Sequence, residues 1–230
     1  MMNNEECRFL DDQGLVFFGR IAAGVSHEIK NHLAVINEQS GLMSDLVQMS
    51  NQGSIPTVQR LAGLSRDIAE QVKKADLTVK IFGRFSHTVD EKYCSVDLDD
   101  LLEIMAGVAR RPASGRGVSL VWKAGSCPVN VLTSPFQLEQ LVFLCLEHML
   151  SCAEAGGALT MEAVAAEGGA AIELRCPGKE LSPIPESRCL HLLQKSLQAR
   201  VSCLQKEMGM RIDLPRALPA QFMNGEQDDE

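Results

Sequence analysis

The sequence contains few aromatic residues and no long apolar run. Aromatic side chains make up 4% of its 230 residues, with one tryptophan and one tyrosine. Single-stranded nucleic acid is usually bound by several stacked aromatic rings, so this kind of binding is not expected. No segment approaches the roughly 18 apolar residues that a transmembrane helix needs. The first residues are polar and acidic, and they lack the basic and apolar regions of a secretory signal peptide.

Positive charge is also scarce. The chain has 30 acidic and 22 basic residues, which gives a formal charge of −8. A net acidic chain without a basic cluster is a poor partner for nucleic acid or an anionic membrane. The eight cysteines form no Cys-x-x-Cys pair, and several lie inside apolar runs. This pattern favours reduced thiols over a disulfide framework, so we expect a cytoplasmic protein.

Two long amphipathic helices are predicted in the first ninety residues. Apolar residues recur at steps of three and four, which predicts one helix over residues 12–49 and a second that begins near Ile55. A turn cluster at residues 50–54 separates them. The stripes comprise Leu15, Phe18, Ala22, Val25, Ile29, Leu33 and Ile36 in the first helix, and Val58, Leu61, Ile68, Val72, Ala75, Val79 and Phe82 in the second. Two helices alone cannot cover apolar faces of this length, so either a second copy of the hairpin, in a homodimer, or the C-terminal half of the chain is expected to cover them.

A histidine with polar neighbours lies off the first stripe. At about 100° per residue, His27 is roughly 200° from Val25 and Ile29, so its ring is expected to point outward. The order His-Glu-Ile-Lys-Asn-His nearly matches the zinc motif H-E-x-x-H, but the second histidine, His32, is five positions away rather than four. The two rings then diverge by roughly 140° around the helix, which argues against zinc hydrolysis.

The segment Ser26-His27-Glu28-Ile29-Lys30-Asn31 resembles the phosphoacceptor box of sensor histidine kinases. The resemblance implies a helical hairpin that dimerises into a four-helix bundle, with His27 carrying the phosphoryl group. It also implies that Glu28 acts as a base or hydrogen-bond acceptor for the ring, and that Asn31 supports phosphatase activity. The proline that usually follows is replaced by His32, which removes a source of helix bending.

From about residue 89 the pattern changes to short strands that alternate with helices. The predicted strands are 93–97, 118–122, 129–132, 158–164, 170–176 and 210–214, and the predicted helices are 101–108, 134–152 and 187–206. This order predicts helices packed over one face of a mixed sheet. The expected fold class is therefore α+β, a long antiparallel helical hairpin followed by an α/β sandwich. The expected boundaries are a flexible N-terminus at 1–13, the hairpin at 14–88, the α/β domain at 89–215 and an acidic flexible tail at 216–230.

The second half resembles the ATP-binding domain of histidine kinases, but the residues that bind nucleotide in that family are replaced. Leu144 and His148 occupy the positions of two asparagines, one of which binds Mg²⁺ in the family. The stretch 176–180 lacks the aspartate that contacts adenine, and the later glycine-rich lid is absent. Mg²⁺-nucleotide needs oxygen ligands and flexible glycine backbone. We therefore predict no ATP binding, no bound metal and no other cofactor.

An intact phosphoacceptor box joined to a degenerate ATP-binding domain resembles the kinase-derived, dimeric histidine phosphotransferases of bacterial phosphorelays. This resemblance implies transfer of a phosphoryl group between aspartates of response-regulator receiver domains through His27. By the family's pattern, the receiver supplies Mg²⁺. We expect Ala23, Gly24 and Ala34 to let a receiver approach closely, and Lys30 to help seat it.

Three alternatives remain open at this stage. The chain could dock receivers as a scaffold without any chemistry of its own. It could act through Asn31 as a phosphatase that drains a receiver, or it could be a histidine kinase with a divergent ATP site. Nucleotide binding, retention of label and the effect of replacing His27 distinguish these alternatives.

Overall fold

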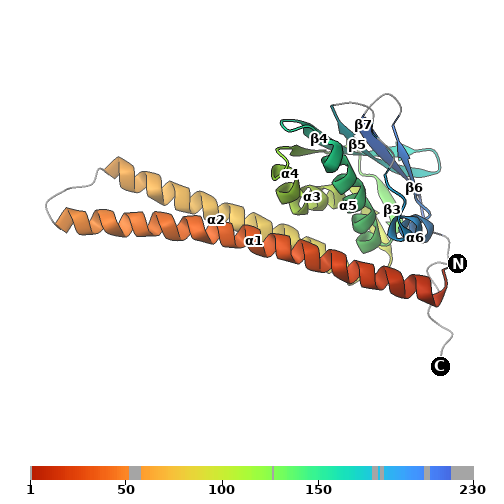
Figure 1. Cartoon of the computed structure of the whole chain (residues 1–230), viewed down its shortest axis with the longest axis horizontal. Coiled ribbons are helices and arrows are strands. Elements are labelled where there is room, and N and C mark those ends of the chain that lie inside the picture. The colour runs from red at the N-terminus through yellow and green to blue at the C-terminus, as the bar shows by residue number, and fades with distance from the viewer. Residues whose placement is uncertain are drawn as a thin grey trace. The chain divides into compact units, whose positions relative to one another are not determined.

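The computed structural model describes residues 2–51, 58–125, 127–177, 181, 184–204 and 208–218. The chain forms two compact units, shown in Figure 1. Residues 21–83 make up the helical hairpin, and residues 1–20 together with 84–230 make up the α/β unit. Among the described residues, none of the helices combines the length and the apolar character needed to cross a membrane.

The first helix, α1 (Asn4–Asn51), begins earlier than predicted. The expectation of a flexible segment at residues 1–13 is therefore corrected, because residues from Asn4 onward are helical. The cause is a reciprocal cap at the start of the helix. The Glu6 backbone N–H donates to Asn3 Oδ1 at 2.8 Å, and the Asn3 N–H donates to the Glu6 carboxylate at 2.9 Å. Such a cap satisfies two backbone donors that the first turn otherwise leaves unpaired.

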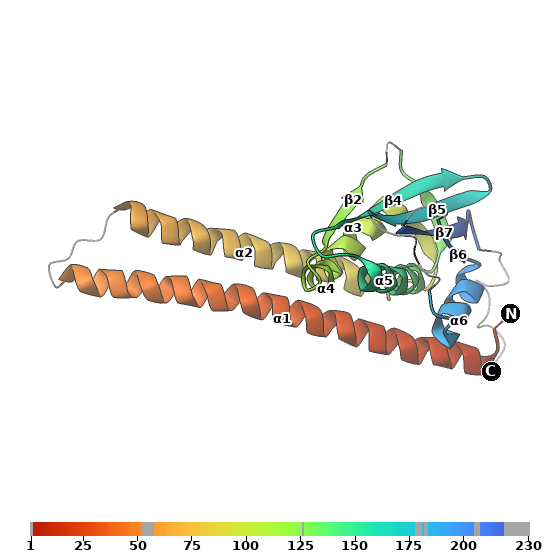
Figure 2. The same ribbon diagram turned by 45° about the horizontal axis from the view of Figure 1, so that its top comes forward.

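The hairpin pairs α1 with α2 (Val58–His87), and Figure 2 shows the two helices running side by side. The predicted start of the second helix, near Ile55, lies outside the described residues. Within one chain the most buried apolar residues of the hairpin are Ile21, Val25, Leu46 and Ile81. The predicted stripe overlaps this set only in part, since Leu33 is 50% exposed. The apolar surface of the hairpin is therefore wider than the side that the paired helices bury.

The α/β unit is built on a five-stranded sheet. Its strand order is β2 (Ser119–Lys123), β4 (Ala158–Ala166), β5 (Gly169–Cys176), β7 (Met208–Pro215) and β6 (Arg200–Cys203). Strands β2 and β4 run parallel, and the other neighbours are antiparallel. The strands predicted at 158–164 and 170–176 form an antiparallel hairpin, β4–β5, and Gly168 in its turn takes a positive φ of 79°. A separate antiparallel pair joins β1 (Cys94–Asp97) to β3 (Asn130–Thr133).

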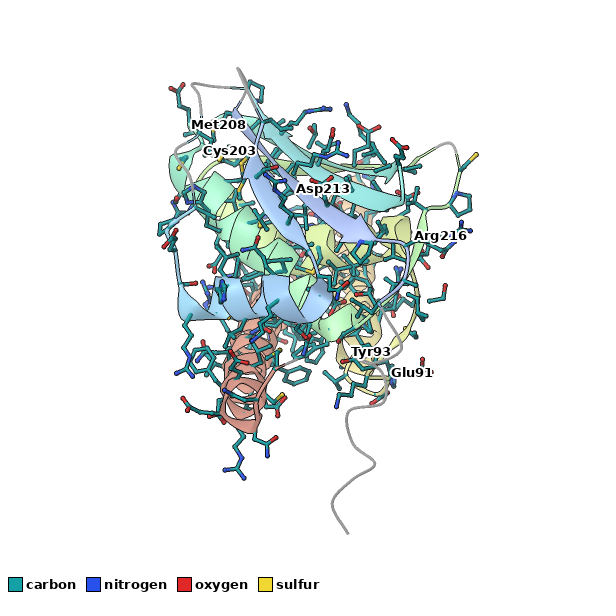
Figure 3. The ribbon with its side chains drawn as sticks, turned by 90° about the vertical axis from the view of Figure 1, so that its right-hand side faces the viewer. Glu91, Tyr93, Cys203, Met208, Asp213 and Arg216 are labelled. Carbon is teal, nitrogen blue, oxygen red and sulfur yellow. The ribbon has the colours of Figure 1, made fainter. Side chains whose placement is uncertain are left out.

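Three helices of the α/β unit cover one face of this sheet, and Figure 3 shows two of them, α5 and α6, beneath the strands. They are α3 (Leu98–Val108), α5 (Pro135–Cys152) and α6 (Arg188–Leu197), and a short helix, α4 (Arg110–Ser114), follows α3. The Asp97 carboxylate accepts hydrogen bonds from the backbone N–H groups of Asp99 and Asp100, which caps the start of α3. Fully buried core side chains from both layers are Leu102, Met105, Leu138, Leu146, Met149, Leu159, Met161 and Ile172. The fold class is α+β, with a long helical region followed by a mixed sheet.

The last helix is shorter in the structure than the predicted range of residues 187–206. Helix α6 ends at Leu197, and Gln198 follows in the left-handed conformation with φ 49°. The Ala199 N–H donates to the Gln194 carbonyl at 2.9 Å, which closes the helix end. The chain then enters β6, which pairs with β7. Residues 200–203 of the predicted helix therefore form an edge strand.

The first turns of α1 are attached to the α/β unit by charges and aromatic rings. Glu5 pairs with Arg188 at 2.7 Å, and Glu6 pairs with Lys195 at 2.8 Å, so both acids reach α6. Farther along α1, Phe17 packs against Phe85 with ring centroids 5.6 Å apart. Of the predicted flexible tail at 216–230, residues 216–218 are ordered beside β3, where Ala217 forms a parallel bridge with Leu132, and the remainder lies outside the described residues.

Candidate functional site

The predicted phosphoacceptor, His27, lies on the exposed side of α1 within the hairpin. It is far from either end of this 48-residue helix, so regular backbone hydrogen bonds hold it in place on both sides. Among the described residues its ring has no hydrogen-bond or ion-pair partner. A rigid helix thus presents the imidazole to solvent.

The residues predicted to admit a receiver share that exposed side. Ala23, Lys30 and Ala34 are separated from His27 by four, three and seven positions, which places them along one face of the helix. All three are exposed. Gly24 is half-buried, and a Cβ built on it would meet no atom within 4 Å. The residues Ala23, Gly24 and Ala34 near the imidazole are therefore small, and Lys30 adds one positive charge.

Asn31 and Glu28, which both follow His27 on α1, differ in their exposure to solvent. Asn31 is exposed and follows His27 by one turn. Glu28 is half-buried, and its Oε1 lies 4.0 Å from His32 Nε2. The structure thus brings His27 and Asn31 together on the surface, whereas the Glu28 carboxylate points to a histidine of the next turn.

His32 is a residue whose position the sequence did not explain. Its side chain is 15% exposed, and its Nδ1 lies 2.8 Å from Gln71 Oε1 on α2. It therefore links the two helices of the hairpin beside the phosphoacceptor box. The only sequence signal was a polar residue at a position that helical spacing places next to Ile29 and Ile36 on the inner side.

Leu144 and His148, which the sequence predicts to stand in place of two nucleotide-binding asparagines, both belong to α5. Leu144 and His148 are half-buried on α5, and the residues 178–180 lie outside the described residues. Beside them on the same helix, Glu147 pairs with Arg20, whose guanidinium lies 5.4 Å from the centroid of the Phe143 ring. Among the described residues, no three histidine, cysteine, aspartate or glutamate side chains are grouped as a metal site requires.

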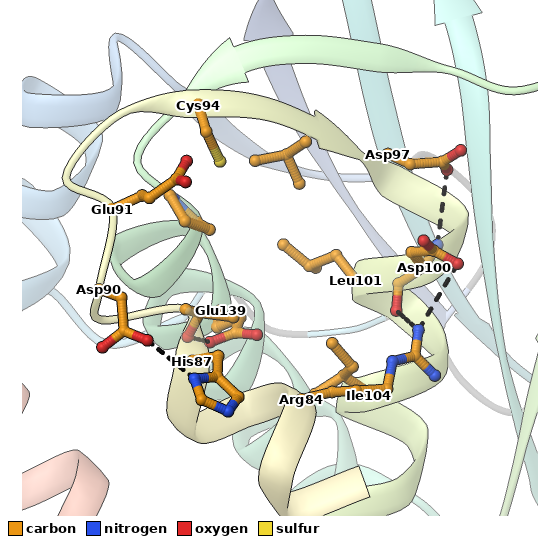
Figure 4. A pocket seen from close by; sticks show the side chains of 13 residues that line it. Arg84, His87, Asp90, Glu91, Cys94, Asp97, Asp100, Leu101, Ile104 and Glu139 are labelled. Carbon is orange, nitrogen blue, oxygen red and sulfur yellow. Dashed lines mark hydrogen bonds and ion pairs between the residues drawn. The ribbon is translucent and has the colours of Figure 1, made fainter. Parts of the chain in front are cut away.

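A cavity of ≈ 370 Å³ in the α/β unit has a buried carboxyl group in its wall. Figure 4 shows this cavity, which is lined mainly by the end of α2, the following loop, β1 and α3. Glu139 on α5 is fully buried, and Thr88 Oγ1 lies 2.7 Å from both Glu139 Oε2 and the Phe85 carbonyl oxygen. A hydroxyl has one hydrogen and a carbonyl oxygen can only accept, so a protonated Glu139 supplies the second hydrogen. Burial raises the pKa of Glu139 to about 8, and the Thr88 contact opposes part of that rise.

Comparison with known proteins gives matches in structure only. No family model matches the chain, and no curated protein gives a significant match. The catalytic domain of histidine kinase ThkA is similar over 56% of this chain and 100% of its own, with a TM-score of 0.48 and 9% identity. Histidine kinase AdeS of Acinetobacter baumannii is similar over 83% of this chain and 98% of its own, with a TM-score of 0.44 and 12% identity.

A third solved structure contains ThkA in complex with the response regulator protein TrrA. It is similar over 92% of this chain and 65% of the matched chain, with a TM-score of 0.46 and 12% identity. At these identities and TM-scores, no activity, partner or residue role is transferred from the solved structures to this chain. The site is therefore defined by its own residues, with His27 at its centre.

Proposed function

We propose that this chain is a histidine phosphotransferase that moves a phosphoryl group between receiver-domain aspartates through His27. The observation that carries the proposal is an exposed imidazole on a rigid helix, inside a sequence that resembles a phosphoacceptor box. Its neighbours Ala23 and Ala34 are small and exposed, which favours close approach of a folded partner. The replaced nucleotide ligands at positions 144 and 148 favour a phosphorylated protein over ATP as the phosphate source.

The chemistry of the proposed transfer needs little from this chain beyond the ring. An unprotonated nitrogen of His27 attacks the phosphorus of the aspartyl phosphate, a nitrogen–phosphorus bond forms, and the aspartate oxygen leaves as carboxylate. The other ring nitrogen keeps its hydrogen, and a nearby carboxylate such as Glu28 can accept it. The second transfer reverses these steps on another receiver. Phosphoryl transfer passes through a loose transition state, so its rate depends mainly on the alignment of the reacting groups and on the neutralisation of their charge. Lys30 contributes one positive charge to the surface that faces the receiver.

Replacing His27 with alanine is expected to abolish labelling of the protein by a phosphorylated receiver. The test incubates the full chain with purified receiver domains that carry labelled aspartyl phosphate, and it measures acid-labile label on this chain. The matched control is His191→Ala, which removes an exposed histidine from α6. Label on the wild type and on the control, but not on His27→Ala, supports the phosphotransferase.

The same experiment separates the other functions. Label from ATP alone would identify a histidine kinase, and faster loss of receiver phosphate without label would identify a phosphatase. If a broad panel of receivers gives neither label nor dephosphorylation, the proposal is wrong and a docking scaffold is the better account.

We further propose that two copies of the hairpin associate into a four-helix bundle. In a single chain, the predicted stripe is left partly uncovered: Val72 and Val79 on α2 are 51% and 52% exposed, and Leu33 on α1 is 50% exposed. These residues lie beside the inner side of the hairpin, where a second hairpin would cover them.

Replacing both Val72 and Val79 with aspartate is expected to convert a dimer into a monomer, because two charges would be buried against apolar neighbours. Leu77→Asp is the matched control: Leu77 is 45% exposed but lies about 140° and 200° around α2 from the two valines. Light scattering after size-exclusion chromatography measures the mass. A wild type that is already monomeric at micromolar concentration would contradict the bundle.

A further inference from the structure

We propose that the protonation state of His32 determines the hydrogen-bond partner of the Glu28 carboxylate. Protonated His32 binds this carboxylate, and neutral His32 leaves it available to the ring of His27. This inference rests on the proposed function, since it concerns the same phosphoacceptor box. The observation that carries it is an unpaired nitrogen. His32 Nε2 is buried and has no hydrogen-bond partner among the described residues, and the nearest carboxylate oxygen is Glu28 Oε1 at 4.0 Å.

The first step concerns the tautomer of His32. An amide oxygen can only accept a hydrogen bond, so the 2.8 Å contact between His32 Nδ1 and Gln71 Oε1 requires the hydrogen on Nδ1. In the neutral ring, Nε2 then has a lone pair and no hydrogen. This lone pair faces a carboxylate that also can only accept. The neutral ring therefore leaves Nε2 without a hydrogen-bond partner and does not attract the Glu28 carboxylate.

The second step concerns the protonated ring. A proton on Nε2 turns it into a donor and adds a positive charge, while the Gln71 contact keeps the ring in place. Glu28 is four residues before His32, so the two side chains lie on one side of the helix. Their side chains are 22% and 15% exposed, so water screens the attraction only in part. Protonated His32 therefore draws the Glu28 carboxylate inward, and neutral His32 releases it.

The third step connects this choice to the phosphoacceptor. His27 precedes Glu28 and is about 100° away around the helix, on the exposed side. The same carboxylate cannot accept from a ring on the inner side and from a ring on the outer side at once. When His32 is neutral, Glu28 is available to the N–H of His27. When His32 is protonated, His27 loses that acceptor.

Other charged groups near His32 are few. On α1 the group that faces it is Glu28, and on α2 it is the uncharged Gln71. The charged residues within one turn of Gln71 are all exposed, and they are Asp67, Glu70, Lys73 and Lys74. Lys74 already pairs with Glu70 at 2.6 Å. Glu28 is therefore the charged group that a protonated His32 ring meets.

The test compares wild type with His32→Gln, which keeps a polar group near Gln71 but never carries a charge. Single-turnover transfer from a phosphorylated receiver is measured from pH 5.5 to pH 8. The wild type is expected to lose rate more steeply on the acid side than His32→Gln, because two protonations rather than one oppose transfer. In a Glu28→Gln background, His32→Gln is expected to have no further effect on the profile. Far-ultraviolet circular dichroism confirms that each variant folds.

A nuclear magnetic resonance titration provides a readout that needs no receiver. The Glu28 carboxyl carbon is expected to change its shift as His32 Nε2 takes up a proton, and this change is expected to vanish in His32→Gln. The inference would be overturned if the Glu28 chemical shift did not respond to protonation of His32. It would also be overturned if wild type and His32→Gln accepted label with the same pH dependence of the rate. Absence of label on the wild type at every pH would instead overturn the proposed function, and the titration would still decide the pairing of Glu28.

Discussion

Replacing Phe85 with alanine is expected to lower the free energy of unfolding of the α/β unit by about 3–5 kcal/mol. Phe85 is fully buried at the end of α2. Its ring packs edge-on against Phe17 and stacks on Phe18, with centroids 5.6 Å away in each case, and Phe136 lies at 6.1 Å. The substitution removes the ring that all three share and leaves a cavity that a rigid helix end cannot close. For a domain of ordinary stability, that loss is a large fraction of the total.

The measurement is chemical denaturation followed by the fluorescence of Trp122, the only tryptophan in the chain. Because Trp122 lies in β2, its signal reports the α/β unit. The control is Val121→Ala on the same strand, where the side chain is 41% exposed and a loss below about 1 kcal/mol is expected. Equal losses for the two variants would show that the aromatic cluster does not hold the end of α2.

The second large effect is a fall in stability with rising pH that depends on Glu139. The pKa of this carboxyl is about 8 in the folded chain and 4.5 without the protein's influence. Between these values the folded state holds a proton that the unfolded state releases, so stability falls as pH rises. The loss from pH 5 to pH 8 is about 3 kcal/mol for this group alone. Protonated Glu139 also completes the hydrogen bonding of Thr88, so its ionisation loosens the contact between α5 and the end of α2.

Glu139→Gln is expected to remove this dependence, since an amide stays neutral and can still donate to Thr88. The free energy of unfolding is measured at pH 5, 6, 7 and 8 for wild type and variant, with Glu154→Gln as a control at an exposed carboxylate. The difference between wild type and Glu139→Gln should grow with pH, and the control should follow the wild type. Parallel curves for all three proteins would mean that Glu139 is ionised in the folded chain near neutral pH.

Much of the fold follows from local signals. The sequence places a glycine between β4 and β5 where a tight turn needs a positive φ, and it places Pro135 at the first turn of α5. The end of α6 has no such signal, because Gln198 rather than glycine takes the left-handed position. Without a glycine to mark the end of the helix, the pattern predicted a helix where β6 lies. The start of α1 was readable from Asn3 and Glu6, which form its cap.

The site was predictable to the extent that it depends on one helix. Periodicity alone places His27 on the outer side of α1, and it places Lys30 and Asn31 near it. The contact of His32 with Gln71 depends on the register between α1 and α2, which no local pattern encodes. Glu139 is similar: a charge on an apolar helix hints at burial, but Thr88 is 51 residues away in the chain. The partners of both groups appear only when distant segments meet.

The attachment of the first turns of α1 also sets an order of assembly during synthesis. Glu5 and Glu6 meet Arg188 and Lys195 across 183 and 189 residues of chain, and Arg20 meets Glu147 across 127. Contacts this distant in sequence form late. The hairpin of residues 21–83, by contrast, can close on neighbours that have already left the ribosome. The first turns of α1 therefore complete their contacts with α6 only after residues 188–195 have been synthesised, and until then their apolar side chains stay exposed.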